Sequence, residues 1–338
     1  MNLIPVRIKP AVWRFLLFLA LPASLAAQAE TPKADTVVYE KHGKPRRLYP
    51  QWTVSSHPDT FEVYETDISI ENGDTTRSRT RSGLLRYSVD SATAAAVWLS
   101  VYAAPDLYKN SIETKECPVL ENLPAETHFQ YNLPASGGDD NLKLLNCAEL
   151  QPFFAPIFQR GIDCQRAHLK AGDGISRRLL DRLQENAGAC DAVSGLLRKD
   201  LSKLLQWHGM LAPKKGALRY KVQERNFAQY IMVRVEQLTN GNRRYEITED
   251  TSQAPPVEVR MMRGVGNMER FFKNKKEKPV HEAYDMTRIE LTPRNEVVSI
   301  AQTHRSRSVY NGKEKQMYFD YRLERRGMPL VAPPVDKH

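Results

Sequence analysis

Two rows of arginines are the residues whose spacing points most clearly to a chemistry. Arg77, Arg79 and Arg81 alternate with small polar residues in one segment, and Arg305 and Arg307 do so in another. Because the side chains of a strand alternate between its two faces, each row points in one direction. Such a row can bind phosphate or carboxylate groups through paired hydrogen bonds. The alternative is a solvated sheet face, on which basic residues protect an exposed edge.

Four cysteines form the second set of reactive side chains, and all lie in the middle third of the chain: Cys117, Cys147, Cys164 and Cys190. An even number of cysteines in an exported chain predicts two disulfides, with three pairings to choose from. We favour Cys164–Cys190 with Cys117–Cys147. This pairing assumes a helix over 162–171 and another over 175–186, packed antiparallel across a glycine-rich turn.

Metal binding and catalysis have weaker signals. Cys164 and His168 stand four residues apart, a spacing that places both on one helix face and suits a metal ion, but no second pair completes a ligand set. The sequence also lacks a His-Glu-x-x-His motif, a Gly-x-Ser-x-Gly elbow and a complete glycine-rich phosphate loop. We therefore assign no catalytic residue, no metal site and no cofactor, and favour a non-enzymatic protein while leaving catalysis open.

The first 29 residues have the composition of a secretory signal peptide. Basic residues precede an uninterrupted apolar stretch at 15–21, and Ala27-Gln28-Ala29 has the small-x-small pattern of a cleavage site. We predict cleavage near Ala29 and a periplasmic or secreted mature protein. A retained anchor is the alternative, but the apolar stretch at 15–27 has 13 residues, short of the roughly 20 that span a bilayer, so we expect a soluble chain.

The charge of the chain restricts its partners. The formal net charge is +9, and removal of the three basic residues in the predicted signal peptide leaves +6. Basic proteins of the cell envelope meet anionic components such as lipid headgroups and acidic polymers. A solubilising surface is the alternative interpretation of this charge. We expect no nucleic-acid partner, because the chain is predicted to be exported and carries no binding motif.

Changes of hydrophobic period divide the remaining chain into three regions and a tail. Alternating segments and Asn-Gly turns at 72–73, 240–241 and 311–312 predict antiparallel hairpins in the first and third regions. Apolar residues at three- and four-residue spacing predict helices in the second, where Pro152 and Pro156 should shorten or kink the first helix. The predicted boundaries are 30–135 for the first β region, 136–210 for the helical region with the cysteines, 211–330 for the second β region and 331–338 for the tail.

These regions predict an α+β fold. We expect a long-stranded, curved antiparallel β-sheet or half-barrel built from the N- and C-terminal β regions, with a disulfide-stapled helical insertion between them. Whether the two β regions form one sheet or two stays open. Aromatic and methionine residues of the last region would line one sheet face, as core or as a groove: Phe227, Tyr230, Met232, Tyr245, Met261, Met262, Met317, Tyr318, Phe319 and Tyr321.

The combined features favour an exported protein that binds an apolar or amphipathic, lipid-like ligand or an anionic envelope partner. The sheet would supply the apolar face, and the arginine rows would supply contacts to anions. One alternative is a structural or assembly partner in the envelope, recognised by β-edge pairing. Another is a hydrolase acting on envelope polymers. The identity of the ligand and the oligomeric state do not follow from the sequence.

Overall fold

The structure is a computed structural model. It describes residues 36–38, 45–55, 57–112, 117, 123–135, 142–169, 174–186, 189–223, 228–250, 280–310 and 313–327. The predicted signal peptide, the turn at 311–312 and the predicted tail lie outside the described residues.

One antiparallel sheet dominates the described part of the chain. It has twelve strands in the order β1-β9-β10-β11-β12-β13-β14-β3-β4-β5-β6-β7. Because β14 pairs with β3, the N- and C-terminal β regions form one sheet. The strands are β1 (Thr36–Val38), β3 (Asp59–Glu71), β4 (Asp74–Ala92), β5 (Ala96–Ala103), β6 (Thr127–Pro134), β7 (Lys143–Leu144), β9 (Gly216–Gln223), β10 (Ala228–Gln237), β11 (Arg243–Asp250), β12 (Val280–Leu291), β13 (Val297–Tyr310) and β14 (Lys313–Arg325).

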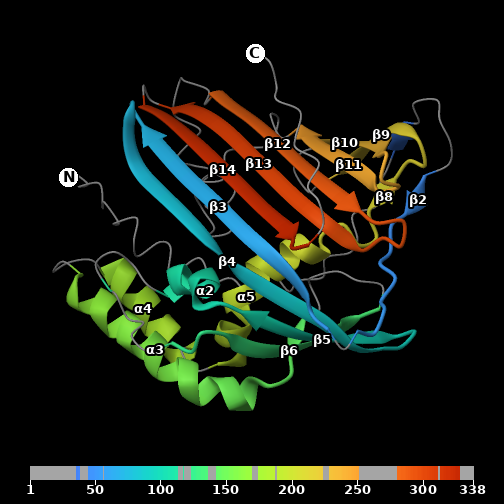
Figure 1. Cartoon of the computed structure of the whole chain (residues 1–338). Coiled ribbons are helices and arrows are strands. Elements are labelled where there is room, and N and C mark those ends of the chain that lie inside the picture. Colours follow the sequence, from blue (N-terminus) through green and yellow to red (C-terminus); the bar gives the residue numbers. More distant parts are fainter. Residues whose placement is uncertain are drawn as a thin grey trace.

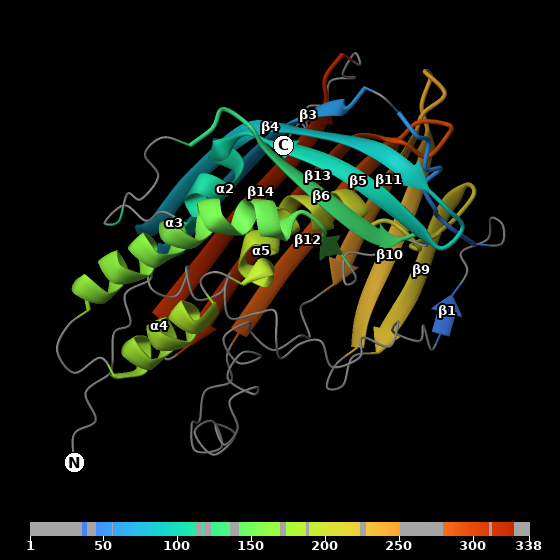
Figure 2. The same ribbon diagram turned by 90° about the horizontal axis from the view of Figure 1, so that it is seen from below.

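The prediction of long antiparallel strands is confirmed, whereas the half-barrel shape is not. The sheet is open, with β1 and β7 at its two ends. The short strands β2 (Arg46–Arg47) and β8 (Leu211–Ala212) pair with each other outside it. Figures 1 and 2 show that the long strands twist strongly relative to one another, as strands of L-residues do.

Two of the predicted Asn-Gly hairpins lie in the described residues. Between β3 and β4, Asn72 and Gly73 have φ angles of 54° and 88°. Between β10 and β11, Gly241 has a φ of 85°. Asparagine and glycine tolerate this left-handed conformation, which tight hairpin turns require, so these turns fix where the strands reverse.

Helices cover one face of the sheet, which we call the helix-covered face; it carries the buried side chains of Val63, Leu85, Ile300 and Leu323. The helices are α2 (Pro105–Ile112), α3 (Cys147–Ala167), α4 (Gly174–Asn186) and α5 (Cys190–Leu205). Helix α5 lies across the strands (Figure 2). Near its start, the Ser194 carbonyl accepts a hydrogen bond from the Tyr131 hydroxyl of β6 at 3.4 Å. At its other end, Gln206, just beyond the helix, accepts a hydrogen bond from Gln302 of β13.

Helix α3 is longer than the sequence predicts. It runs over 21 residues and includes both Pro152 and Pro156, so the prediction that these prolines shorten it is wrong. Each proline removes a backbone hydrogen bond, at a cost of about 3 kcal/mol inside a helix. Burial of Phe154, Phe158 and Ile162 against the core offsets this cost.

The two predicted disulfides are present, but our favoured pairing is wrong. The bonds join Cys117 to Cys164 and Cys147 to Cys190, with Cα–Cα distances of 5.9 and 5.6 Å. Because α3 begins at Cys147, Cys164 lies near its other end, about 25 Å away at roughly 1.5 Å per residue. Helix α4 packs against α3 and returns the chain toward its start, so Cys190 arrives beside Cys147.

The segment after α5 packs through aromatic rings. Trp207 is 1% exposed, and its ring lies 4.4 Å from that of His208, which also contacts the ring of Trp52 at 5.2 Å. Burial lowers the pKa of His208 to about 3, against an ordinary value of 6.5. The imidazole is therefore neutral in the folded protein at neutral pH.

Acidification should destabilise the protein through His208. In the unfolded chain the imidazole takes up a proton below pH 6.5, whereas the folded chain resists protonation down to about pH 3. Stability therefore falls as the pH drops through this window, by about 2 kcal/mol between pH 7 and pH 5. Urea unfolding at both pH values should show a smaller pH dependence in His208→Phe than in the native chain. Equal pH dependence in both proteins would contradict this assignment.

Candidate functional site

The two arginine rows lie on opposite faces of the sheet. Arg81 pairs in register with Glu65 of β3, on the helix-covered face. Arg305 pairs with Tyr318, which in turn pairs with Ile68, a residue of the other face. Residues opposite one another in a sheet share a face, and successive residues alternate. The structure therefore does not bring the two rows into one site.

Arg81 belongs to a buried ionic network that attaches α5 to the sheet. Its guanidinium is 5% exposed and donates to both carboxylate oxygens of Asp200, at 2.9 and 2.8 Å. It also donates to Glu65 at 2.6 Å, and Glu65 accepts a second bond from Lys199 at 2.6 Å. Burial raises the pKa of Glu65, but the charges of Arg81 and Lys199 outweigh this effect, so its pKa lies below the ordinary value. The network fixes α5 over β3 and β4.

Other arginines of the rows face carboxylates on neighbouring strands. The pairs are Arg77 with Asp67, Arg305 with Asp320 and Arg307 with Glu314. Arg79 lies between Arg77 and Arg81 on the same strand, and pairs in register with Asp67. An external anion would have to compete with these carboxylates. Anion binding by the rows stays a prediction.

A cavity of about 170 Å³ lies on the helix-covered face next to the C-terminal half of α5. We call it the α5 pocket. Its lining comes from α5 and from β11 to β14: Lys203, Glu249, Asp285, Met286, Thr287, Gln302, Thr303, His304 and Phe319. The neighbouring Gln302 amide donates to Gln206, just beyond α5, at 3.1 Å, so the helix and the pocket floor are directly connected.

Charged groups and one aromatic ring give the α5 pocket its character. Burial lowers the pKa of Lys203, as does the charge of Lys199, whereas Glu249 and Asp285 oppose this shift. The Lys199 ammonium lies 4.7 Å from the centre of the Phe319 ring. In the α5 pocket itself, the partly desolvated Lys203 ammonium and the Phe319 ring line one cavity, an arrangement that can hold a ligand with both an anionic and an apolar part.

His304 and Asp285 form a hydrogen-bonding contact inside the α5 pocket. The His304 Nδ1 contacts an Asp285 carboxylate oxygen, and both side chains are about 30% exposed. A histidine held through Nδ1 presents its other nitrogen for hydrogen bonding or proton transfer. The pair adds a second polar contact on the pocket wall opposite α5.

The predicted aromatic and methionine face is divided by the structure. Tyr245 and Tyr321 are buried core residues, and Phe319 lines the α5 pocket. Met232 and Tyr318 alternate with core residues and therefore lie on the other face. Phe227, Met261 and Met262 lie outside the described residues. Among the described members of this face that the structure places, Phe319 is the one that lines the α5 pocket.

Of the residues in the α5 pocket, Phe319 belongs to the predicted aromatic and methionine face, whereas Lys203, Asp285 and His304 were not identified from the sequence as site residues. The turn at 293–295 indicates a hairpin, but a bulge between Glu290 and Leu291 shifts its register by one residue. If the register of the Leu291–Val297 pair continued along the hairpin, Thr303 would lie opposite Asp285. Because of the bulge, His304 lies opposite Asp285 instead. A bulge of this kind exchanges the two faces of one strand relative to the other.

Within the described residues, one group of side chains has the spacing of a metal site: Cys117, Cys164 and His168, with ligand atoms within 4.8 Å of one another. The two sulfurs are joined in the disulfide, so neither is available as a thiolate ligand in this oxidised form. None of the helices in the described residues is both long enough and apolar enough to span a bilayer.

Comparisons with known proteins leave the family open. No protein-family model matches the chain, and no curated protein does. Among solved structures, the chain aligns with Ail, the attachment invasion locus protein of Yersinia pestis, at 5% identity over 80% of this chain and 99% of that one, with a TM-score of 0.14. It also aligns with a DUF1329 family protein from Desulfovibrio piger, at 7% identity over 81% and 89% of the two chains, again with a TM-score of 0.14. Similarities this low carry no argument about fold or function.

Proposed function

We propose that this chain is an exported, non-enzymatic protein of the cell envelope that holds an amphipathic ligand in the α5 pocket. The observation that carries this proposal is the position of Lys203 and Phe319 in one cavity beside a helix that is fixed to the sheet. Two disulfides support a compartment outside the cytoplasm, because thiols stay reduced inside it. The predicted signal peptide agrees with that compartment.

The charges of the α5 pocket favour a zwitterionic headgroup. An anionic group of the ligand would lie beside Lys203, and an amine would lie beside Glu249 or Asp285. The start of an acyl chain would contact Phe319. A cavity of about 170 Å³ accommodates a headgroup and a short apolar segment rather than a whole lipid, so we expect the remaining chain to lie outside it.

Substitution of Lys203 tests this proposal. Lysophosphatidylethanolamine, used below its micelle concentration, should bind the native mature chain in isothermal titration calorimetry. Lys203→Gln should weaken binding by about tenfold, the effect of losing roughly 1.4 kcal/mol from one charge-assisted contact. Lys215→Gln is the matched control, because Lys215 is exposed outside the pocket, and it should bind like the native chain.

Two outcomes would count against the proposal. Equal weakening by Lys203→Gln and Lys215→Gln would show that general positive charge, not the pocket, attracts the lipid. Cleavage of the lipid during the titration, detected as a change of its mass, would favour the hydrolase instead, with the His304–Asp285 pair as its general base.

A further inference from the structure

A histidine lies against the disulfide between Cys117 and Cys164 at the C-terminal end of α3. The Nδ1 atom of His168 is 3.8 Å from the Cys164 Sγ and 3.9 Å from the Cys117 Sγ. Cys164 and His168 are about one helical turn apart, so both lie on one side of α3. Cys117 is 47 residues earlier in the chain than Cys164. Tertiary packing therefore brings three side chains with metal-binding atoms to one place.

The two nitrogen–sulfur distances are close to those of a tetrahedral zinc site. Zinc binds thiolate sulfur at about 2.3 Å and imidazole nitrogen at about 2.0–2.1 Å, so adjacent sulfur and nitrogen ligands lie about 3.6 Å apart. The distances of 3.8 and 3.9 Å from His168 Nδ1 require only a small adjustment. Two thiolates on one zinc ion lie about 3.8 Å apart, so the disulfide has to be reduced before such a site can form.

The three residues differ in their exposure to solvent. Cys117 is 2% exposed, whereas Cys164 is half-buried and His168 is exposed. A reducing thiol can therefore approach the disulfide from the side of Cys164 and His168. The same side gives a metal ion access to water, which commonly supplies the fourth ligand where a protein supplies three.

Metal binding through Nδ1 requires the other tautomer of His168. In the disulfide form, Nδ1 donates to the Cys164 carbonyl at 2.8 Å, because a carbonyl oxygen can only accept. Since the ring is exposed, water can remove the proton from Nδ1 and supply one to Nε2. The Cys164 carbonyl still accepts from the backbone amide of His168 at 3.2 Å. The change of tautomer therefore leaves this carbonyl with a hydrogen-bond donor.

We propose that reduction of the Cys117–Cys164 disulfide creates a zinc site, in which the two thiolates, His168 Nδ1 and one water are the ligands. A dithiol of the envelope supplies two electrons and two protons; it becomes a disulfide, and the two cysteines become thiols. Each thiol releases its proton to water when zinc binds. The metal ion then joins Cys117 to α3 as the disulfide does, so this connection persists under reducing conditions. The site is independent of the α5 pocket and of the ligand proposed there.

The second disulfide provides an internal comparison. Among the residues that the structure describes, the metal-binding atoms of Cys117, Cys164 and His168 form a group of three, and no such group includes Cys147 or Cys190. Reduction of that second bond exposes two thiols without a third ligand beside them. Zinc should therefore distinguish the two cysteine pairs.

Zinc binding by the mature chain before and after reduction provides the first test. Tris(carboxyethyl)phosphine becomes a phosphine oxide as it reduces each disulfide to two thiols, and pyridylazoresorcinol then competes for the added zinc. The native chain should bind zinc tightly only when it is reduced. Cys117→Ala/Cys164→Ala should lose this binding, whereas Cys147→Ala/Cys190→Ala should keep it. Equal zinc binding by the two double variants, or none by the reduced native chain, would overturn the proposal.

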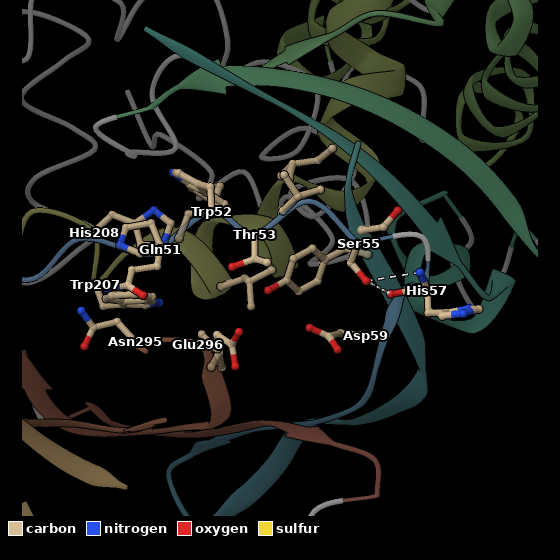
Figure 3. A pocket seen from close by; sticks show the side chains of 18 residues that line it. Gln51, Trp52, Thr53, Ser55, His57, Asp59, Trp207, His208, Asn295 and Glu296 are labelled. Atoms are coloured by element: carbon tan, nitrogen blue, oxygen red, sulfur yellow. Dashed lines mark hydrogen bonds between the residues drawn. The ribbon is translucent and has the colours of Figure 1, made fainter. Parts of the chain in front are cut away.

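A matched pair of histidine variants provides the second test and leaves all four cysteines in place. His168→Ala removes one ligand and should weaken zinc binding by the reduced chain at least about tenfold, the loss expected even for a group that only orients a ligand. His57→Ala is the control. His57 is also exposed, but it lines a separate cavity of about 50 Å³ beyond α5, where its carbonyl accepts from the Ser55 hydroxyl at 2.7 Å (Figure 3). Native-like zinc affinity in His168→Ala, or equal weakening in both variants, would contradict the assignment.

Discussion

Replacement of Asp200 by asparagine should lower the free energy of unfolding by about 3–5 kcal/mol. Asp200 is 0% exposed and accepts two hydrogen bonds from Arg81, whose guanidinium is itself 5% exposed. Without the Asp200 charge, Arg81 keeps Glu65 as a carboxylate partner but shares it with Lys199, so two buried or half-buried cations face one carboxylate and part of the positive charge is left uncompensated. Urea unfolding followed by circular dichroism measures the loss directly.

An exposed ion pair of the same sheet provides the control for Asp200. The Arg307 guanidinium donates to Glu314 at 2.7 Å, but the two side chains are 49% and 35% exposed. Solvent screens such a pair, so Glu314→Gln should leave the free energy of unfolding close to that of the native chain. Similar small losses for both variants would show that Asp200 is solvated and that α5 is not held by a buried network.

Loss of the disulfide between Cys147 and Cys190 should destabilise the protein by about 4 kcal/mol. The bond closes a loop with a sequence separation of 43, and it joins the first residues of α3 and α5. Without it the unfolded chain gains conformational entropy, while the folded chain loses a fixed contact between two helix N-termini. The double variant Cys147→Ala/Cys190→Ala, compared with the native chain in urea, measures the effect.

The second disulfide distinguishes a general entropy effect from a local one. Cys117 and Cys164 have a similar sequence separation of 47, so their replacement by alanine should cost about the same stability. Only the Cys147–Cys190 bond is attached to α5, and only its loss should also weaken ligand binding in the α5 pocket. Unchanged stability in either double variant would contradict the pairing in the structure.

Local patterns in the sequence predicted the long antiparallel strands and the helical region between them, but not the extent of α3. The Asn-Gly turn at 72–73 has the predicted left-handed geometry, and the change of hydrophobic period locates the helical region between two sets of strands. The disulfides themselves followed from an even number of cysteines in a chain predicted to be exported. Their pairing did not, because it depends on the start of α3 at Cys147, which two prolines in that helix concealed.

The site depends on register, which the sequence did not reveal. A bulge between Ser69 and Ile70 shifts the β3–β4 pairing by one residue, so that Arg81 lies opposite Glu65. Without that bulge, the register set by the pair Ile70 and Thr75 would place Thr80 there, and the arginine row would point away from α5. The partner Asp200 is 119 residues distant in sequence. Bulges and contacts of this range arise from tertiary packing rather than from local composition.

Native mass spectrometry of the protein purified from its own compartment is the most direct test of the proposed function. The account predicts a bound species with the mass of an amphipathic molecule, present on the native chain and on Lys215→Gln but depleted on Lys203→Gln. Protein that is repeatedly empty, and that takes up no lysophosphatidylethanolamine when it is supplied, would contradict the assignment of the α5 pocket as a ligand site.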